Sequence, residues 1–198
     1  MRLAFLASHN GSAAKAIMQA CQRGDLNGDP VLLISNNPDS GALQWSTDMD
    51  LKNYCLNEKN MQGADNLDRE IAAILSDHVI DLVICSGYMK LIGPETIASV
   101  KGRILNVHPA LLPKHGGKGL YGRHVHDAVI AAGDRETGIT IHRVNGEYDK
   151  GPIVAQLRMP VKAGETADHI EHRVKAAEPD FYIQTLRAIL DGSIKLPA

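Results

Sequence analysis

Short apolar runs that alternate with helix-like segments constrain the fold of this chain more than any other feature. The clearest apolar runs are residues 3–7, 31–35, 82–85 and 103–107. Apolar residues at helical spacing lie between these runs, at about 12–23 and 66–77. A strand without a polar face has to be covered on both sides, and helices between successive strands provide such cover in parallel sheets. The pattern therefore predicts an α/β fold with a doubly wound, mainly parallel sheet.

The last third of the chain has a different pattern. Residues 138–144 and 153–159 alternate in side-chain character, which is typical of strands with one exposed face. We expect these two runs to form an antiparallel pair after the parallel strands. A long helix over about 167–190 is expected to close the chain, with Pro179 as a point at which it can kink.

The composition of the chain excludes several classes of protein. With 198 residues, of which 44% are hydrophobic, it can bury one core in a single domain. Its formal net charge of −2 gives no general attraction to nucleic acid or to an anionic membrane. No apolar stretch approaches the ~18 residues of a membrane span, and no basic-then-apolar targeting signal is present. Cys21, Cys55 and Cys85 are odd in number and lie in apolar surroundings, so we expect reduced, buried thiols in a cytoplasmic protein.

The end of the run at 103–107 carries the residues that most clearly indicate chemistry. Asn106 and His108 are two positions apart, so in a strand they project from the same face, and Pro109 ends the strand just beyond them. An amide donor beside an imidazole suits a reaction that builds an oxyanion, because the amide can bond the new charge while the imidazole bonds it or moves a proton. The alternative is a strand end whose polar side chains only cap the loop backbone, and the spacing alone leaves both interpretations open.

A second candidate is the loop over residues 8–13, between the first strand and the first helix. Gly11 permits a tight turn, and the amides that follow it form an anion nest of the kind that holds phosphate. Neither a GxGxxG fingerprint nor a Walker lysine is present, which argues against a nicotinamide cofactor or ATP. Ser12 acting as a simple helix cap is the alternative.

Two more loops are candidates for a ligand site. In the loop over 86–94, Met89, Leu91 and Ile92 could enclose a flat heteroaromatic ligand, although such side chains more often pack in a core. Asp149 lies in a turn bounded by glycine and proline, where an aspartate usually accepts backbone hydrogen bonds. If Asp149 folded against His108, its carboxylate would raise the pKa of the imidazole and orient the ring.

The segment over residues 114–126 is rich in glycine and contains three histidines. A metal site built from His115, His124 and His126 is conceivable, but the cysteine and carboxylate partners of a zinc site are missing at recognisable spacing. We therefore expect no metal, and we interpret this segment as a mobile lid over a site.

Taken together, these motifs resemble those of the folate-dependent formyltransferases. The likeness rests on Asn-x-His-Pro-x-Leu-Leu-Pro at 106–113 and Glu-Tyr-Asp-x-Gly-Pro at 147–152, and it extends from the loop at 10–12 to the last helix. It implies a formyltransferase-like variant of the Rossmann fold in a single domain over residues 1–198. Within that domain, about 1–100 would form the phosphate- and nucleotide-binding half, and about 101–198 the catalytic and folate-binding half.

The resemblance also implies roles for individual residues. The catalytic residues would be Asn106, His108 and Asp149. The folate pocket would be formed by Met89, Lys90, Leu91, Ile92, Asn145, Gly146, Glu147 and Tyr148. The substrate phosphate and ribose would be held by Asn10, Gly11, Ser12, Ala13, Lys175 and Glu178, with the lysine on phosphate and the glutamate on ribose hydroxyls.

The implied activity is transfer of a formyl group from 10-formyltetrahydrofolate to the primary amine of glycinamide ribonucleotide, in de novo purine biosynthesis. The amine would attack the formyl carbon directly, without a covalent enzyme intermediate. The folate is then a co-substrate, and the partners are small molecules, with no nucleic acid and no membrane. A homodimer is a possible assembly that the sequence does not specify.

The chain departs from the family pattern at several positions. Ala13 stands where asparagine usually follows the Gly-Ser of the phosphate loop, and Ala64 lies near the place of an arginine expected to reach the phosphate. Arg69 and Lys59 are candidates to replace that arginine, and the loop over 116–126 is longer than in the commonest members. These departures affect the identity of the amine acceptor more than the formyl-transfer chemistry.

Three alternatives follow from these departures. The chain could be a formyltransferase for a different amine, or a hydrolase that uses water to deformylate 10-formyltetrahydrofolate. It could also be a folate- or nucleotide-binding protein without catalysis, although the presence of Asn106, His108 and Asp149 argues against this.

Overall fold

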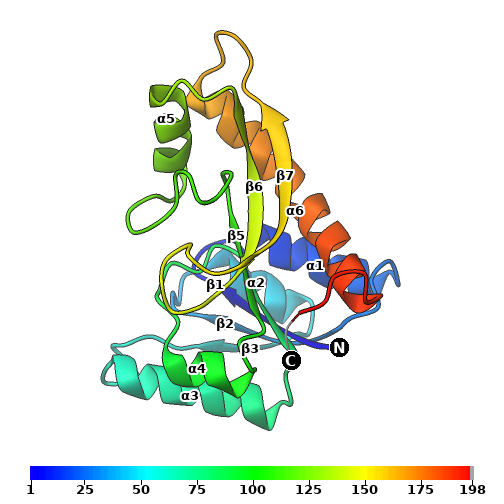
Figure 1. Cartoon of the computed structure of the whole chain (residues 1–198). Coiled ribbons are helices and arrows are strands. Elements are labelled where there is room, and N and C mark those ends of the chain that lie inside the picture. Colours follow the sequence, from blue (N-terminus) through cyan, green and yellow to red (C-terminus); the bar gives the residue numbers. More distant parts are fainter. Residues whose placement is uncertain (197–198) are drawn as a thin grey trace.

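The computed structural model describes residues 1–196, and the strands of this part form one continuous sheet (Figure 1). The strands are β1 (Arg2–Ala7), β2 (Asp29–Ser35), β3 (Lys52–Cys55), β4 (Leu82–Cys85), β5 (Ile104–His108), β6 (Glu136–Arg143) and β7 (Ile153–Pro160). Their order in the sheet is β3-β2-β1-β4-β5-β6-β7. The strands β1 to β5 are parallel, whereas β6 and β7 are antiparallel. The predicted parallel core with an antiparallel C-terminal pair is confirmed.

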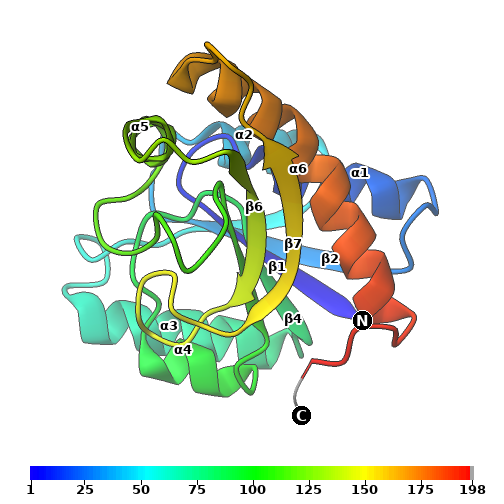
Figure 2. The same ribbon diagram turned by 45° about the horizontal axis from the view of Figure 1, so that its top comes forward.

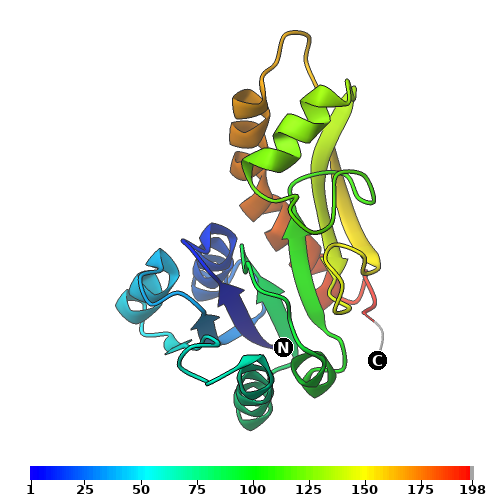
Figure 3. The same ribbon diagram turned by 90° about the vertical axis from the view of Figure 1, so that its left-hand side faces the viewer.

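Helices cover both faces of the parallel strands. They are α1 (Ser12–Gln22), α2 (Gly41–Asp48), α3 (Ala64–Asp77), α4 (Pro94–Ser99), α5 (Arg123–Ala131) and α6 (Ala167–Leu190). In β1, Leu3 and Phe5 pack on the face covered by α1, α2 and α6, while Ala4 and Leu6 pack on the face covered by α3 (Figure 3). This two-sided burial is the reason that the parallel strands have no polar face. The long closing helix spans the predicted residues, with Pro179 inside it.

Several short elements were not predicted. The turn-rich stretch after β2 leads into α2 and the edge strand β3, and α4 follows the loop after β4. The helix α2 is stabilised by tertiary contacts, since Trp45 is buried in the same hydrophobic cluster as Leu3 and Phe5 of β1 and donates its indole N–H to the Asn10 carbonyl. The helix α4 is capped from outside, because Asp68 of α3 accepts hydrogen bonds from the Glu95 and Thr96 amides. Contacts between distant segments of this kind leave no local signal in the sequence.

The pairing of β5 with β6 positions the polar residues at the end of the parallel sheet. In this antiparallel register Asn106 lies opposite His142, and His108 lies opposite Thr140. The strands β6 and β7 continue together beyond the parallel strands, with α6 alongside them (Figure 2). The helix α6 packs against α1, which covers the parallel strands, and against α5, which precedes β6.

The structure also shows how far the three cysteines are buried. All three cysteines are free thiols, but only Cys85 is buried; Cys21 and Cys55 are half-buried. The prediction of full burial was therefore wrong for these two, since Cys55 ends the edge strand β3 and Cys21 lies in the last turn of α1. Over residues 1–196, no helix combines the length and the apolar character needed to cross a membrane.

Candidate active site

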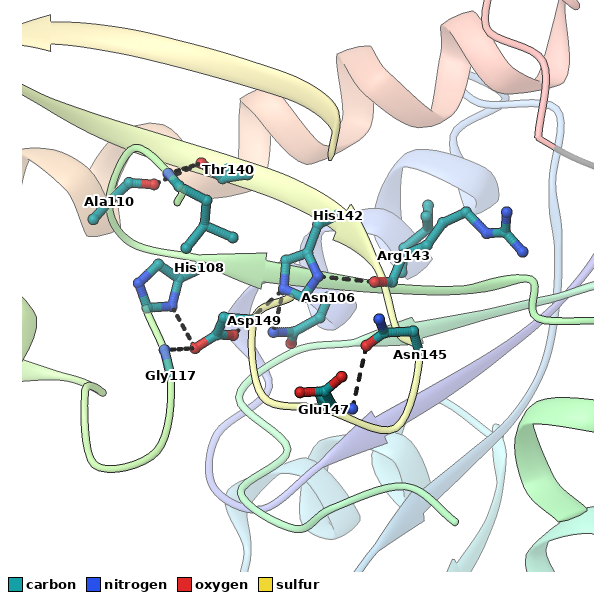
Figure 4. A network of polar contacts seen from close by, with 12 residues as sticks. Asn106, His108, Ala110, Gly117, Thr140, His142, Arg143, Asn145, Glu147 and Asp149 are labelled. Carbon is teal, nitrogen blue, oxygen red and sulfur yellow. Dashed lines mark hydrogen bonds and ion pairs between the residues drawn. The ribbon is translucent and has the colours of Figure 1, made fainter. Parts of the chain in front are cut away.

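Two strands, β5 and β6, bring an amide and two imidazoles onto one face of the sheet (Figure 4). Directly opposed residues of an antiparallel pair have side chains on the same face, so Asn106 and His142 meet across the strands. The Asn106 Nδ2 and His142 Nε2 atoms are 3.1 Å apart. His108, at the end of β5, is only 3% exposed.

Asp149 reaches this face from the turn between β6 and β7. One carboxylate oxygen lies 3.4 Å from His108 Nδ1 and accepts a hydrogen bond of 3.0 Å from the Gly117 amide, while the other lies 3.4 Å from His142 Nε2. The turn is tight, because a Cβ on Gly151 would lie 1.6 Å from the Arg143 carbonyl oxygen. The structure thus brings Asn106, His108 and Asp149 together through a turn that folds back onto β5.

The hydrogen bonds of His108 fix its tautomer. Nε2 lies 2.8 Å from the carbonyl oxygen of His115, and a carbonyl can only accept, so Nε2 carries the hydrogen. Burial lowers the pKa of His108, although the Asp149 carboxylate opposes this shift. The neutral ring therefore presents the lone pair of Nδ1 to Asp149, which would stabilise the ring once Nδ1 takes up a proton.

The carboxylate of Asp149 is held in its charged form. Burial raises its pKa, but the neighbouring imidazoles of His142 and His108 and the hydrogen bond from the Gly117 amide outweigh burial and leave the pKa below the ordinary value. A carboxylate and a neutral imidazole in contact form a pair that can accept a proton from a substrate.

Thr140 fixes the start of the loop that follows β5. Its hydroxyl donates to the Ala110 carbonyl at 2.7 Å and accepts from the Leu112 amide at 3.0 Å and the Gln156 side chain at 2.9 Å. This buried network holds the chain that leads to the His115 carbonyl. The last part of the expected lid, from Arg123 onward, is helical, because α5 begins there.

A small cavity of about 50 Å³ adjoins the polar cluster. Three of its lining residues are Asn106, His142 and Asp149, so the polar groups form part of its wall. The predicted folate residues that line it are Lys90, Leu91, Ile92, Glu147 and Tyr148. Met89 lines a second cavity of about 450 Å³, which shares Tyr88, Lys90, Leu91, Ile92 and Tyr148 with the first. The remaining predicted folate residues, Asn145 and Gly146, belong to the turn between β6 and β7 but line neither cavity.

Four residues that line the small cavity were not among the predicted site residues. They are Cys85, Tyr88, His142 and Val144. Cys85 ends β4, and Tyr88 lies in the loop over 86–94 that the sequence already indicated as a candidate ligand site. Burial raises the pKa of Cys85 to about 12, which keeps its thiol protonated.

The predicted phosphate loop precedes α1. Gly11 is the residue before the helix and has a φ of 56°, a conformation that favours glycine. Ser12 is exposed, and within residues 1–196 neither its amide nor that of Ala13 donates to a protein acceptor. The Ala13 side chain is fully buried in the core, so only its backbone amide can serve a ligand. Free amides at a helix N-terminus are suited to an anion.

The pair predicted on α6 consists of an exposed lysine and a half-buried glutamate. Lys175 forms an ion pair of 2.6 Å with Glu171, one turn earlier. Burial raises the pKa of Glu178 to about 7, and the charge of Lys175 only partly opposes this. His126 of α5 is 1% exposed, and its Nδ1 has no hydrogen-bond partner among the described residues. Burial lowers the pKa of His126, and the charge of Glu171 on α6 opposes this shift.

Ala64, the position of the expected arginine, begins α3 and lines the larger cavity together with Lys90 and Tyr148. No residue of the phosphate loop lines that cavity, so this position borders the predicted folate segment instead. Arg69 contacts Asn66 on the exposed side of α3.

Over residues 1–196, no three His, Cys, Asp or Glu side chains are grouped so that they could hold a metal ion.

Known proteins are similar to this chain in sequence and in fold. The profile of a family described as "Formyl transferase" matches residues 1–186. A protein named "Phosphoribosylglycinamide formyltransferase, chloroplastic" from Arabidopsis thaliana is 39% identical over 195 residues, which are 98% of this chain and 67% of that protein. The protein named phosphoribosylglycinamide formyltransferase from Escherichia coli (strain K12) is 31% identical over 99% of this chain and 90% of its own length. A crystal structure of phosphoribosylglycinamide formyltransferase from Bacillus halodurans superposes with a TM-score of 0.88 at 31% identity, covering 99% of this chain and 98% of that one.

Proposed function

This chain belongs to the formyl transferase family, and from that membership we propose that it transfers the formyl group of 10-formyltetrahydrofolate to the amine of glycinamide ribonucleotide in de novo purine biosynthesis. The observation that carries the proposal is the cluster in which Asp149 contacts His108 and His142 while Asn106 contacts His142. This cluster forms part of the wall of a cavity beside the predicted folate segment.

The reaction requires one bond to form and one to break at the formyl carbon. The amine nitrogen attacks this carbon and the carbonyl becomes an oxyanion in a tetrahedral intermediate. The bond to N10 of the folate then breaks, and the oxyanion collapses to the new formamide. Overall, one proton leaves the amine and one reaches N10, so the enzyme has to stabilise the oxyanion and move a proton.

Each polar group of the cluster has a role in these two tasks. The Asn106 amide lines the cavity and donates an N–H to the oxyanion. The pair of Asp149 and His108 takes the proton from the amine and returns it to N10. His108 serves at Nδ1, because its Nε2–H is donated to the His115 carbonyl. Asp149 both orients the ring and stabilises its charged form.

The two substrates would bind at different places, the folate at the cavity and the ribonucleotide phosphate at the start of α1. The folate would occupy the two adjoining cavities that share Leu91 and Ile92, with its formyl group toward Asn106. The phosphate of the ribonucleotide would bind at the free amides of Ser12 and Ala13 before α1. Lys175 would contribute charge to the phosphate, and Glu178 would accept hydrogen bonds from ribose hydroxyls.

The test is to incubate the protein with 10-formyltetrahydrofolate, with and without glycinamide ribonucleotide, and to follow release of tetrahydrofolate. We expect release that depends on the ribonucleotide. Release without any amine would instead identify a hydrolase, and release only with another amine would identify a different acceptor. Absence of release with every amine would contradict catalysis and leave a binding protein.

A further inference from the structure

His142 has no role in the mechanism described so far, although it lies at the centre of the polar cluster (Figure 4). It is 1% exposed, lines the small cavity and contacts two of the three proposed catalytic residues. Its Nε2 lies 3.1 Å from Asn106 Nδ2 and 3.4 Å from an oxygen of Asp149. Its Nδ1 lies 2.9 Å from the carbonyl oxygen of Arg143.

These contacts determine what Nε2 can do. The Arg143 carbonyl only accepts, so the hydrogen of a neutral ring is on Nδ1 and Nε2 keeps a lone pair. That lone pair needs a donor, and the charged carboxylate of Asp149 has none to offer. The amide nitrogen of Asn106 has two hydrogens and is the closer neighbour. A neutral His142 therefore accepts one N–H of Asn106 and leaves the second N–H free.

The orientation of an asparagine amide matters in an oxyanion site. Rotation of the amide by half a turn exchanges its nitrogen and oxygen at little intrinsic cost, because the two ends have almost the same shape. The nitrogen end donates to an oxyanion, whereas the oxygen end would repel it. A hydrogen-bond acceptor that contacts the nitrogen end of Asn106 selects this orientation, and His142 Nε2 is in that position.

We propose that His142 is a positioning residue that selects the amide orientation of Asn106, by accepting one N–H so that the other is free for the formyl oxygen. This inference rests on the proposed function for its catalytic consequence. A charged His142 would act differently, because its Nε2–H would be donated to Asp149 and the Asn106 amide would have to turn over. The acceptor role and the charged role therefore predict different effects of substitution.

Two substitutions of His142 separate the acceptor from the shape of the ring. His142→Phe keeps a flat ring but removes the acceptor, and we expect kcat to fall about 100-fold with little change in the KM for folate, as expected for loss of alignment in the transition state. His142→Gln keeps an uncharged acceptor and should retain kcat within about 10-fold of the native value. His78→Phe is the matched control, because His78 also bonds a backbone carbonyl through Nδ1 but lies at the end of α3, and its kcat should be unchanged.

A double-mutant cycle shows whether His142 acts through Asn106. In the Asn106→Ala background, His142→Phe should lower kcat by less than about threefold, because the group that His142 positions is already absent. A full loss in that background would mean that His142 acts through Asp149 or through the fold, and would overturn the proposal. Equal loss in the Phe and Gln variants, or native kcat in the Phe variant, would overturn it as well.

A measurement without substrates makes the outcome independent of the proposed function. In ¹H–¹⁵N spectra, the Asn106 side-chain pair is identified by its disappearance in Asn106→Ala, and one of its protons should show the downfield shift and slow exchange of a hydrogen-bonded N–H. His142→Phe should abolish both features, and His142→Gln should retain them. Equivalent, rapidly exchanging protons in the native protein would refute the contact itself. A contact that is confirmed in a protein without transferase activity would refute the proposed function, and with it the catalytic consequence.

Discussion

Replacing Asp149 with asparagine removes one charge from the site while keeping the shape of the side chain. The asparagine oxygen can still accept from the Gly117 amide, and its nitrogen can donate to an imidazole nitrogen, so we expect the turn between β6 and β7 to keep its conformation. The charge that stabilises a protonated His108 would be lost. This variant therefore tests the proposed proton-accepting pair without disturbing the fold.

The size of the effect follows from the contact of 3.4 Å between His108 and Asp149. Opposite charges near this distance attract by about 4 kcal/mol in a partly buried site, and the amide dipole of asparagine recovers part of this. A loss of roughly 3 kcal/mol corresponds to a decrease in kcat of about 10²- to 10³-fold. The pKa of His108 should also fall, because Asp149 raises it in the native protein.

The assay is steady-state release of tetrahydrofolate as a function of pH. We expect a low kcat for Asp149→Asn, with its acid limb at lower pH than in the native enzyme, and an unchanged midpoint of urea unfolding. Asp29→Asn is the control, since Asp29 pairs with Arg2 on the exposed surface, and this variant should behave like the native protein. A kcat of Asp149→Asn within about threefold of the native value would refute the proton-accepting pair.

Three further predictions concern single residues. Asn106→Ala and His108→Ala should each lower kcat at least ~100-fold with the fold intact, which circular dichroism and turnover together would check. Glu178 keeps its proton up to a pKa of about 7 in the folded protein but releases it near 4.5 when unfolded. The free energy of unfolding should therefore decrease by up to about 3 kcal/mol between these pH values and then level off, and Glu178→Gln should remove this slope in urea titrations at several pH values. Asp68→Ala removes two hydrogen bonds to the first amides of α4 and should lower the free energy of unfolding by about 2 to 3 kcal/mol; a loss below about 0.5 kcal/mol would contradict its role as a cap.

The parallel sheet could be predicted because its strands are apolar on both faces, which is a local property of the sequence. The elements that escaped prediction depend on distant contacts. In α2, Trp45 donates a hydrogen bond to the Asn10 carbonyl. At the start of α4, the Glu95 amide donates to Asp68 of α3. Neither contact is visible in a sequence window of helical length.

Some residues of the candidate site could likewise be placed from local sequence, whereas others depend on distant contacts. Asn106 and His108 could be placed on one face because a strand alternates its side chains every residue. The contact with Asp149 depends on a turn that folds back onto β5, so spacing could not establish it. His142 was missed because the alternation in its strand shows which residues share a face but not the register with β5. Only the pairing of the two strands places it opposite Asn106.

The most direct test of formyl transfer is to follow the formyl group itself. The protein would be mixed with 10-formyltetrahydrofolate carrying a ¹³C-labelled formyl group and with glycinamide ribonucleotide, and the products identified by mass spectrometry and ¹³C NMR. We predict that the label appears as a formamide on the ribonucleotide amine at the rate at which tetrahydrofolate forms, and that His108→Ala slows both equally. Label recovered as free formate, or a native rate of transfer by His108→Ala, would contradict the proposed activity or the proposed site, respectively.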